Sequence, residues 1–253
     1  MNSILALMYI LIFIFGITIG SFLNVCILRL PLGESIVTGP SHCPRCGRRL
    51  KWFELIPLFS FLALRGRCSG CKSAISPQYP LIEAVNGVLW VLVFAVLGIT
   101  PLAALTCALG SALLVIAVID GRTGEIPSGT TIFILVLGVI ATVLDLEHWL
   151  SHLIGLFAVS LPLLLLLLAT KGKGIGGGDI KLMAGAGLFL GGWQIALALF
   201  AACLIGTVTH IILMATKKAG SKLAFGPYLA LALQATALWG NTLIAWYMGL
   251  LGL

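Results

Sequence analysis

Long apolar runs that hold almost no ionisable residues dominate this sequence. The run from Leu81 to Ile119 contains one charged residue, Glu83, and the run from Ile180 to Thr216 contains one, Lys181. Over the whole chain 60% of the residues are hydrophobic and 9% are charged, whereas soluble domains carry about 25% charged residues. Runs of this kind are typical of membrane-crossing helices, which need about 20 residues to cross roughly 30 Å of hydrocarbon. The sequence therefore predicts an all-α polytopic membrane protein.

Two of the runs are too long for a single crossing. Leu81–Ile119 has 39 residues, which would extend about 58 Å as one helix at ~1.5 Å per residue, and Gly98 and Pro101 interrupt it. Ile180–Thr216 has 37 residues, with a break at Gly191-Gly192. Splitting both runs predicts about eight transmembrane helices, the other four being residues 5–27, 130–144, 149–169 and 225 to the end.

The positions of Lys and Arg support eight crossings. Cytoplasmic loops of membrane proteins carry an excess of Lys and Arg, and with eight helices and an outside N-terminus all fifteen fall on the cytoplasmic side. The net charge of +7 is then explained by topology and membrane lipids, and we expect no nucleic-acid partner. The fifteen are Arg29, Arg45, Arg48, Arg49, Lys51, Arg65, Arg67, Lys72, Arg122, Lys171, Lys173, Lys181, Lys217, Lys218 and Lys222.

A hydrophilic loop between the first two helices carries two Cys-x-x-Cys pairs. Cys43 and Cys46 form the first pair, Cys68 and Cys71 form the second, and 21 residues lie between the pairs. Four thiolates at such spacing are typical of a tetrahedral Zn²⁺ site, and a reducing compartment argues against two disulfides. Because four sulfurs leave no open position for water, we expect a structural zinc site rather than a catalytic one.

Two of the three aspartates lie where charge is costly. Asp120 ends the third predicted helix and Asp179 opens the sixth, and the topology places both at the cytoplasmic boundary. A carboxylate there needs water, a partner or a polar cavity. Two neighbouring carboxylates share a proton, so that one can act as a general base on water and the other as a general acid. The pair predicts aspartyl-protease chemistry, whereas Asp145, in a polar outer loop with Glu147, predicts a solvated role.

Glycines precede Asp179 and favour the same reading. Gly174, Gly176, Gly177 and Gly178 permit close backbone approach, so that an extended substrate could lie along residues 176–178. A plainer alternative remains open for each acid taken alone. Asp179 would then be a helix N-cap, and Asp120 a helix-end residue near Arg122.

The ordered motifs of this chain resemble the type IV prepilin peptidase family over nearly its whole length. The matching stretches are Gly20-Ser-Phe-Leu-Asn-Val, Cys43-Pro-Arg-Cys46-Gly, Trp52-Phe-Glu-Leu-Ile-Pro-Leu-Phe-Ser, Arg65-Gly-Arg-Cys68, Ser76-Pro-Gln-Tyr-Pro-Leu-Ile-Glu83, Asp120 with Ile126-Pro127, Gly176-Gly-Gly-Asp179-Ile-Lys-Leu and Phe225-Gly-Pro-Tyr-Leu-Ala. One departure is Ser128, where many members carry Asp or Asn after Ile-Pro.

The resemblance implies a bacterial inner-membrane enzyme that removes the leader of type IV prepilins or pseudopilins after a glycine, at the cytoplasmic face. It also implies methylation of the new N-terminus with S-adenosylmethionine. Asp120 and Asp179 match the family's catalytic pair, and Cys43, Cys46, Cys68 and Cys71 match its metal site. Glu83 matches a position linked to methylation, although a paired carboxylate at a helix start is the structural alternative. Glu54 is expected to be structural.

These expectations divide the chain into three parts. Residues 1–30 form the first, retained transmembrane helix, residues 31–80 the cytoplasmic zinc-binding loop, and residues 81–253 the membrane protease core. Three other functions remain open: a leader peptidase without methylation, a proton-coupled transporter and a zinc-stabilised scaffold. A transporter would place its acids near the midplane rather than at helix ends, and a scaffold would tolerate Asp→Asn at both positions.

Overall fold

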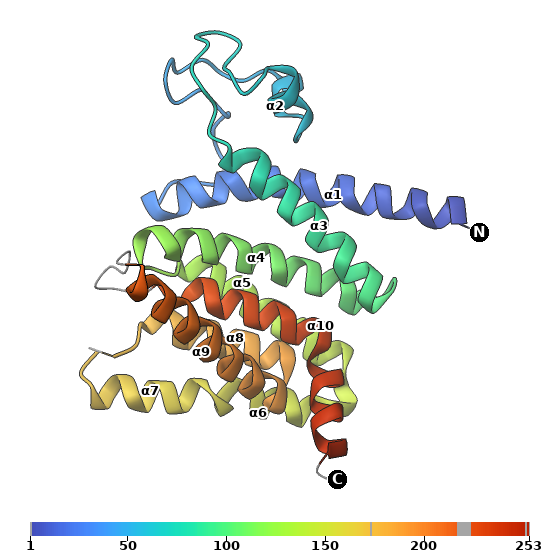
Figure 1. The fold of residues 1–253 in the computed structure, drawn as a ribbon, viewed down its shortest axis with the longest axis vertical. Helices are drawn as coiled ribbons and strands as arrows, with labels where there is room; N and C mark the ends of the chain where they lie inside the picture. Colours follow the sequence, from blue (N-terminus) through green and yellow to red (C-terminus); the bar gives the residue numbers. More distant parts are fainter. Residues whose placement is uncertain (1, 173, 217–223, 251, 253) are drawn as a thin grey trace. The chain divides into compact units, whose positions relative to one another are not determined.

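The computed structural model describes residues 2–172, 174–216, 224–250 and 252, and within them the fold is entirely helical apart from two isolated β-bridges. The chain forms two compact units, Met1–Gly98 and Ile99–Leu253 (Figure 1). The predicted division at residues 30 and 80 was drawn by function, and it stays a prediction.

The first unit is a pair of long helices joined by a loop. Its helices are α1 (Asn2–Arg29), α2 (Phe59–Ala63) and α3 (Gln78–Leu97), with short 3-10 turns η1 (Leu30–Leu32) and η2 (Trp52–Leu55) between them. Glycines let α1 and α3 pack backbone against backbone: a Cβ on Gly16 would lie 2.8 Å from Cα of Gly87. Close packing through small residues is typical of membrane helices. Asn86 adds a hydrogen bond from Nδ2 to the Gly16 carbonyl at 2.7 Å.

The second unit packs the remaining helices around α8. They are α4 (Pro101–Thr123), α5 (Ser128–Leu144), η3 (Leu146–His148), α6 (Trp149–Ala158), α7 (Ser160–Ala169), α8 (Gly177–Leu190), α9 (Gly192–Ala215) and α10 (Gly226–Leu250). α8 contacts α5, α6, α7, α9 and α10, and most of its side chains are buried. From Leu182 onward α8 is therefore held by the core, and its first turn, which carries Asp179, extends from this core.

The predicted helix breaks are observed, while the number of crossings is not confirmed. Gly98 ends α3 at a φ of +68°, and Gly191 separates α8 from α9 at a φ of +93°, a region that favours glycine. Six helical segments of the described chain are long and apolar enough to cross a membrane. α5 has 17 residues and α8 has 14, and both are shorter than the about 20 residues that a helix needs to cross a membrane.

One predicted helix is divided in the structure. Residues 149–169 form two helices, α6 and α7, separated at Val159. The cause is Pro162, which has no N–H to donate to the carbonyl of Ala158 and whose ring would clash with it. The sequence contains this signal, so a break here could have been predicted.

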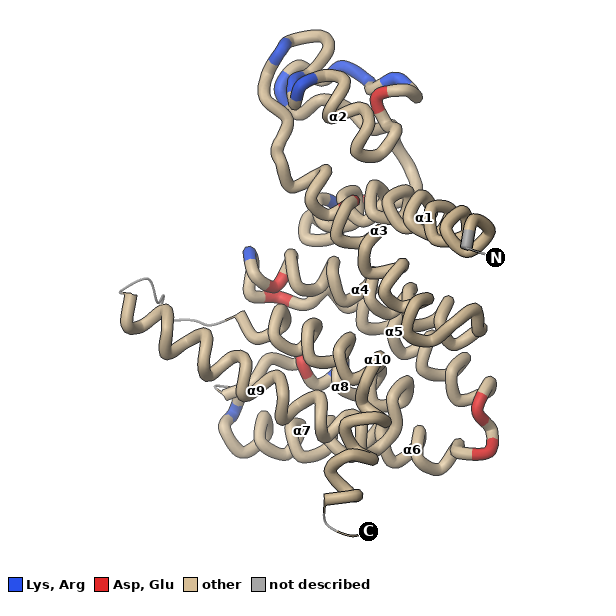
Figure 2. The backbone as a smooth tube through the Cα atoms, turned by 45° about the vertical axis from the view of Figure 1, so that its right-hand side comes forward, with Lys and Arg blue, Asp and Glu red and all other residues tan. Residues whose placement is uncertain are grey.

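Charged residues gather away from the helices of the first unit. Figure 2 shows Lys and Arg concentrated on the loop between α1 and α3, while most of the helical tube is uncharged. Four of the fifteen basic residues used for the topology lie outside the described residues: Lys173, Lys217, Lys218 and Lys222. The inside–outside assignment stays a prediction.

Candidate functional site

Asp120 is buried near the end of α4 and is held by the start of α10. Its side chain is 6% exposed. Oδ2 accepts a hydrogen bond of 2.8 Å from the backbone N–H of Gly226, the first residue of α10, across 106 positions of sequence. A Cβ on Gly226 would lie only 2.7 Å from that oxygen, so no other residue fits here without movement. The α10 N-terminus thus fixes the Asp120 carboxylate, as helix N-termini do for anions.

Asp179 lies in the first turn of α8 and is held in a similar way. Gly176 is the N-cap of α8, so Asp179 occupies the third helical position rather than the N-cap position itself. Its carboxylate accepts a hydrogen bond from the backbone N–H of Gly176, as the third residue of a capping box does. The alternative that Asp179 stabilises the start of the helix therefore describes part of its role, and this role is compatible with acid–base catalysis.

The two carboxylates belong to one site. Both lie in the second unit, and they are close enough to interact electrostatically. Each accepts one backbone N–H from a glycine at the start of a helix, Gly226 for Asp120 and Gly176 for Asp179. Neither forms an ion pair with a Lys or Arg among the described residues. Asp120 is buried and Asp179 is half-buried, and two neighbouring acids without a cationic partner are suited to sharing a proton.

The glycines predicted to form a substrate strip have different surroundings. Gly177 is exposed, and a Cβ there would meet nothing within 4 Å. Gly176 lies beneath Asp179, where a Cβ would be 3.1 Å from Oδ2. Gly178 packs on Ile126, where a Cβ would be 2.9 Å from the Ile126 side chain. Gly177 thus offers open backbone beside the acid, while its neighbours are needed for packing.

The four loop cysteines come together as two matched turns. In the first turn, the N–H of Cys43 donates to the carbonyl of Arg48 and the N–H of Gly47 donates to the carbonyl of Cys43, both at 2.9 Å. In the second, Cys68 donates to Ser73 at 2.9 Å and Lys72 donates to Cys68 at 3.0 Å. Gly47 and Lys72 occupy equivalent positions with φ of +68° and +60°. The left-handed residue of the second turn is therefore Lys72, and not a glycine.

The sulfur positions fit a tetrahedral metal ion. All four Sγ atoms lie within 4.8 Å of one another, and Cys43 and Cys71 are 3.9 Å apart. Zn–S bonds of about 2.3 Å in a tetrahedron require sulfurs about 3.8 Å apart. Backbone N–H groups lower the pKa of Cys43 and Cys68, and the Ser73 hydroxyl lowers the pKa of Cys71, which favours the thiolates that bind metal. The N–H of Arg48 also lowers the pKa of Cys46, but hydrogen bonds among the thiols outweigh it and raise this pKa to about 11.

A polar network ties the two cysteine turns together. Arg48, beside the first turn, donates from Nη2 to Glu54 at 2.6 Å and to the Ser69 hydroxyl at 2.5 Å. Glu54 also accepts the N–H of Lys51 at 2.8 Å. The Lys51 N–H, the Ser69 hydroxyl and the Arg48 guanidinium together lower the pKa of Glu54 to about 2. This buried acid links the turns without touching the sulfurs, as expected for a structural role.

Glu83 is enclosed by groups of the protein itself. The side chain is 7% exposed, and Oε2 accepts the N–H of Leu58 at 2.8 Å. The Ser21 hydroxyl of α1 also donates to this carboxylate. Leu58 is the centre of a γ-turn with φ +59° and ψ −49°, closed by a 2.6 Å hydrogen bond from the N–H of Phe59 to the carbonyl of Pro57. Such turns are rare and strained, so Glu83 holds a conformation that a leucine avoids.

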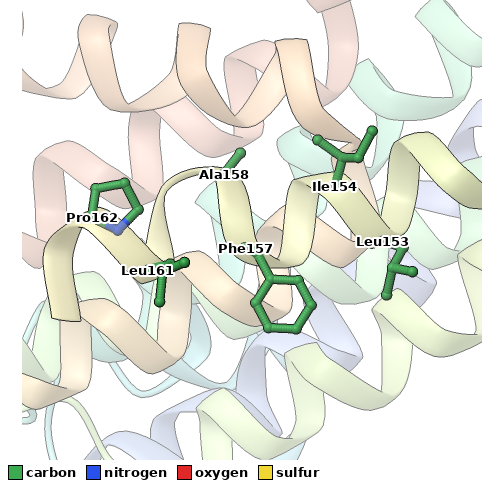
Figure 3. Close-up of a pocket in the computed structure, with 6 residues that line it drawn as sticks. All are labelled: Leu153, Ile154, Phe157, Ala158, Leu161 and Pro162. Carbon is green, nitrogen blue, oxygen red and sulfur yellow. The ribbon is translucent and has the colours of Figure 1, made fainter. Parts of the chain in front are cut away.

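A shallow apolar hollow on α6 and α7 is a weaker candidate for a site (Figure 3). It lies where Pro162 divides the two helices. None of its side chains can act as an acid, a base, a nucleophile or a metal ligand, so it cannot be a catalytic or metal-binding site. Its lining residues are Leu153, Ile154, Phe157, Ala158, Leu161 and Pro162.

Comparison with known proteins identifies the family. The model of the type IV leader peptidase family matches residues 107–211, and that of the bacterial peptidase A24 N-terminal domain matches residues 14–97. A prepilin leader peptidase/N-methyltransferase of Pseudomonas aeruginosa is 34% identical, with 94% of this chain and 92% of the relative aligned. One from Bacillus subtilis is 35% identical over 94% of this chain and 97% of the relative. The chain belongs to the type IV leader peptidase family. No solved structure matched it.

The two matched segments of this leader peptidase family fall in different units of the fold. Residues 14–97 lie in the first unit and include the four cysteines and Glu83, while residues 107–211 lie in the second and include Asp120 and Asp179. Gly226 lies beyond both segments. The sequence analysis did not predict a role for Gly226, because neither glycine nor proline supplies a chemically active side chain. The Gly226-Pro227 pair could have predicted the start of a helix, whose first N–H is available to an acid.

Proposed function

We propose that this protein cleaves the leader from type IV prepilins or pseudopilins after a glycine, with Asp120 and Asp179 as the catalytic pair. The observation that carries the proposal is the electrostatic proximity of these two acids, which are 59 positions apart in the sequence and form no ion pair with Lys or Arg among the described residues. Membership of the family and the names of the relatives support the substrate class.

The chemistry follows from a shared proton. The ionised member of the pair removes a proton from a water molecule as the water oxygen attacks the scissile carbonyl carbon, and the protonated member donates its proton to the carbonyl oxygen. The resulting tetrahedral diol then collapses, the C–N bond breaks, and the proton taken from water passes to the leaving amine. The N–H groups of Gly226 and Gly176 keep the two carboxylates oriented throughout. The open backbone at Gly177 is suited to binding an extended substrate through main-chain hydrogen bonds.

We propose methylation of the new N-terminus as the second activity, with S-adenosylmethionine supplying the methyl group. The printed names of the relatives support it. Glu83 is the residue predicted to serve this activity. Because its carboxylate is buried and bonded to Leu58 and Ser21, its surroundings favour a positioning role over direct contact with the cofactor.

We assign a structural zinc ion to Cys43, Cys46, Cys68 and Cys71, which would fill all four positions of its coordination. We place the enzyme in the bacterial inner membrane, with the cysteine loop and the acid pair on the cytoplasmic side. The excess of Lys and Arg in the loop between α1 and α3 supports this orientation. The expected contacts are prepilins or pseudopilins and membrane lipids, and no nucleic acid.

The test is co-expression with a prepilin followed by intact-mass spectrometry of the product. Asp120→Asn and Asp179→Asn should each abolish leader loss. Asp145→Asn, the remaining aspartate of the chain, is the matched control and should process normally. Wild-type processing by either of the first two variants would refute the assignment. A product that has lost the leader but gained no methyl group would leave the peptidase and remove the methyltransferase.

A further inference from the structure

The loop between α1 and α3 exposes large apolar side chains that a water-soluble loop would not carry. Trp52 is 78% exposed, Phe59 is 64% exposed and Leu62 is 72% exposed. They belong to η2 and α2 and fall within the eleven residues from Trp52 to Leu62. Contiguous exposed apolar surface bordered by polar residues marks a contact with a partner or a membrane.

The hydrogen bonds of Glu83 place this segment beside the membrane-crossing helices. Leu58 is bonded to Glu83, which lies five residues into α3, about 7.5 Å along the helix at ~1.5 Å per residue. Ser21, which bonds the same carboxylate, lies eight residues before Arg29 at the end of α1, about 12 Å along that helix. Both helices are apolar enough to cross a membrane. The Leu58 turn therefore lies beside the ends of two helices that can cross a membrane, inward of their terminal residues.

The backbone around α2 is suited to such surroundings because several of its N–H groups have acceptors within the protein. Ser60 donates to Ile56 at 3.0 Å, Leu62 to Leu58 at 3.1 Å, and Leu64 to Ser60 at 3.0 Å. The N–H of Leu58 donates to Glu83. Unpaired backbone groups are strongly disfavoured near hydrocarbon, and these hydrogen bonds reduce that cost for α2.

Positive charge borders the apolar residues. Arg65, Arg67 and Lys72 line one shallow hollow at the end of α2. Lys51 precedes Trp52 at the other end and is exposed. Glu54, the acid within the segment, is buried and paired with Arg48. Tryptophan and phenylalanine flanked by Lys and Arg are typical of segments that lie in the headgroup region of an anionic leaflet.

We propose that the segment from Trp52 to Ala63 inserts into the anionic leaflet of the membrane that α1 and α3 cross. Trp52, Phe59 and Leu62 contact the acyl chains, and Arg65, Arg67 and Lys72 bind lipid phosphates. The proposed membrane segment also holds the two cysteine turns at the membrane surface, since Glu54 is bonded to Arg48 beside the first turn and to Ser69 of the second.

Fluorescence quenching of Trp52 in the full chain tests the proposal. Wild-type protein and Trp52→Phe are reconstituted into vesicles of phosphatidylcholine and phosphatidylglycerol, and the difference between their emissions isolates Trp52. Acyl-brominated lipid should quench this component, and aqueous acrylamide should not. Trp193→Phe, which removes a similarly exposed tryptophan (73%) of the second unit, is the control for the subtraction.

Three results would overturn the proposal. Quenching by acrylamide alone would place Trp52 in water. Resistance to both quenchers would show that protein covers it, and protection that begins only when a prepilin is added would assign the surface to the substrate. A second experiment tests the charge contribution. When Arg65, Arg67 and Lys72 are all changed to Gln, bromolipid quenching of Trp52 in anionic vesicles should fall to the level that wild-type protein shows in pure phosphatidylcholine. If the variant in anionic vesicles is still quenched as strongly as the wild type, lipid-phosphate binding is refuted. Retained zinc would show that each variant is folded.

Discussion

Replacing Gly226 by alanine should displace Asp120 and slow leader cleavage. The added Cβ would lie 2.7 Å from Oδ2 of Asp120, whereas ordinary contact begins at 3.4 Å, so one group must move by 3.4 − 2.7 = 0.7 Å. Such a shift also stretches the 2.8 Å hydrogen bond from the Gly226 N–H beyond useful length. Misplacement of a catalytic group by about 1 Å costs up to ~10²-fold in rate. We therefore expect kcat to fall about ten- to a hundredfold, or about 1.4–2.7 kcal/mol of barrier.

The assay is the rate of leader removal from purified prepilin in mixed micelles, with kcat and KM determined separately. KM should change little because Gly226 touches the acid and not the substrate strip. Gly129→Ala is the matched control, since a Cβ there meets nothing within 4 Å. Gly176→Ala should be intermediate, because its Cβ would lie 3.1 Å from Asp179 and requires a shift of only 3.4 − 3.1 = 0.3 Å. Wild-type kcat in folded Gly226→Ala, or an equal loss in Gly129→Ala, would refute the reasoning.

Three further changes test the first unit. Cys43→Ser should remove the bound zinc, measured by elemental analysis per chain, and should make the loop sensitive to protease; zinc retained at one ion per chain would contradict the four-sulfur site. Glu54→Gln should weaken the link to Arg48 in zinc-stripped protein. Because the pKa of Glu54 is lowered to about 2 from its ordinary 4.5, the wild-type advantage should be complete above pH 4.5 and be lost as the pH falls towards 2. Loop proteolysis at several pH values measures it, and an advantage that grew on acidification would have the wrong sign. Glu83→Ala leaves the Leu58 N–H without its acceptor, at a cost of about 1–3 kcal/mol. Methylation should fall while leader loss continues, and product masses that still show full methylation would exclude a role for Glu83.

The pairing of Asp120 with Asp179 could be anticipated from sequence because each acid interrupts an apolar run at a helix end. The predicted topology puts both on the same side of the membrane, and in the structure they are near enough to interact electrostatically, while their catalytic role stays a prediction. The clustering of the four cysteines could also be predicted from the sequence, since two short Cys-x-x-Cys turns specify their own local geometry. Local spacing and helix breaks carry information that a single sequence displays.

Contacts between distant segments could not be predicted in the same way. The hydrogen bond from Gly226 to Asp120 joins positions 106 residues apart, and neither residue type indicates the other as its partner. The strained turn at Leu58 is another example, since leucine predicts a right-handed or extended backbone and only the tertiary bond to Glu83 maintains its positive φ. Both features depend on packing, which propensity and periodicity do not encode.

The brevity of α8 has a consequence for how substrates are cut. Its 14 residues extend about 21 Å, roughly 9 Å less than a hydrocarbon layer of about 30 Å. Its far end is anchored beside the polar turn at Asp145, because His152, which contacts Asp145, is also bonded to the carbonyl of Leu188 at 2.9 Å. The shortfall therefore falls at the Asp179 end of α8, so we expect the acid pair to lie below the level of the lipid headgroups. A substrate would then have to unwind within the membrane boundary to meet these acids, and we expect folded proteins to be excluded from them for that reason.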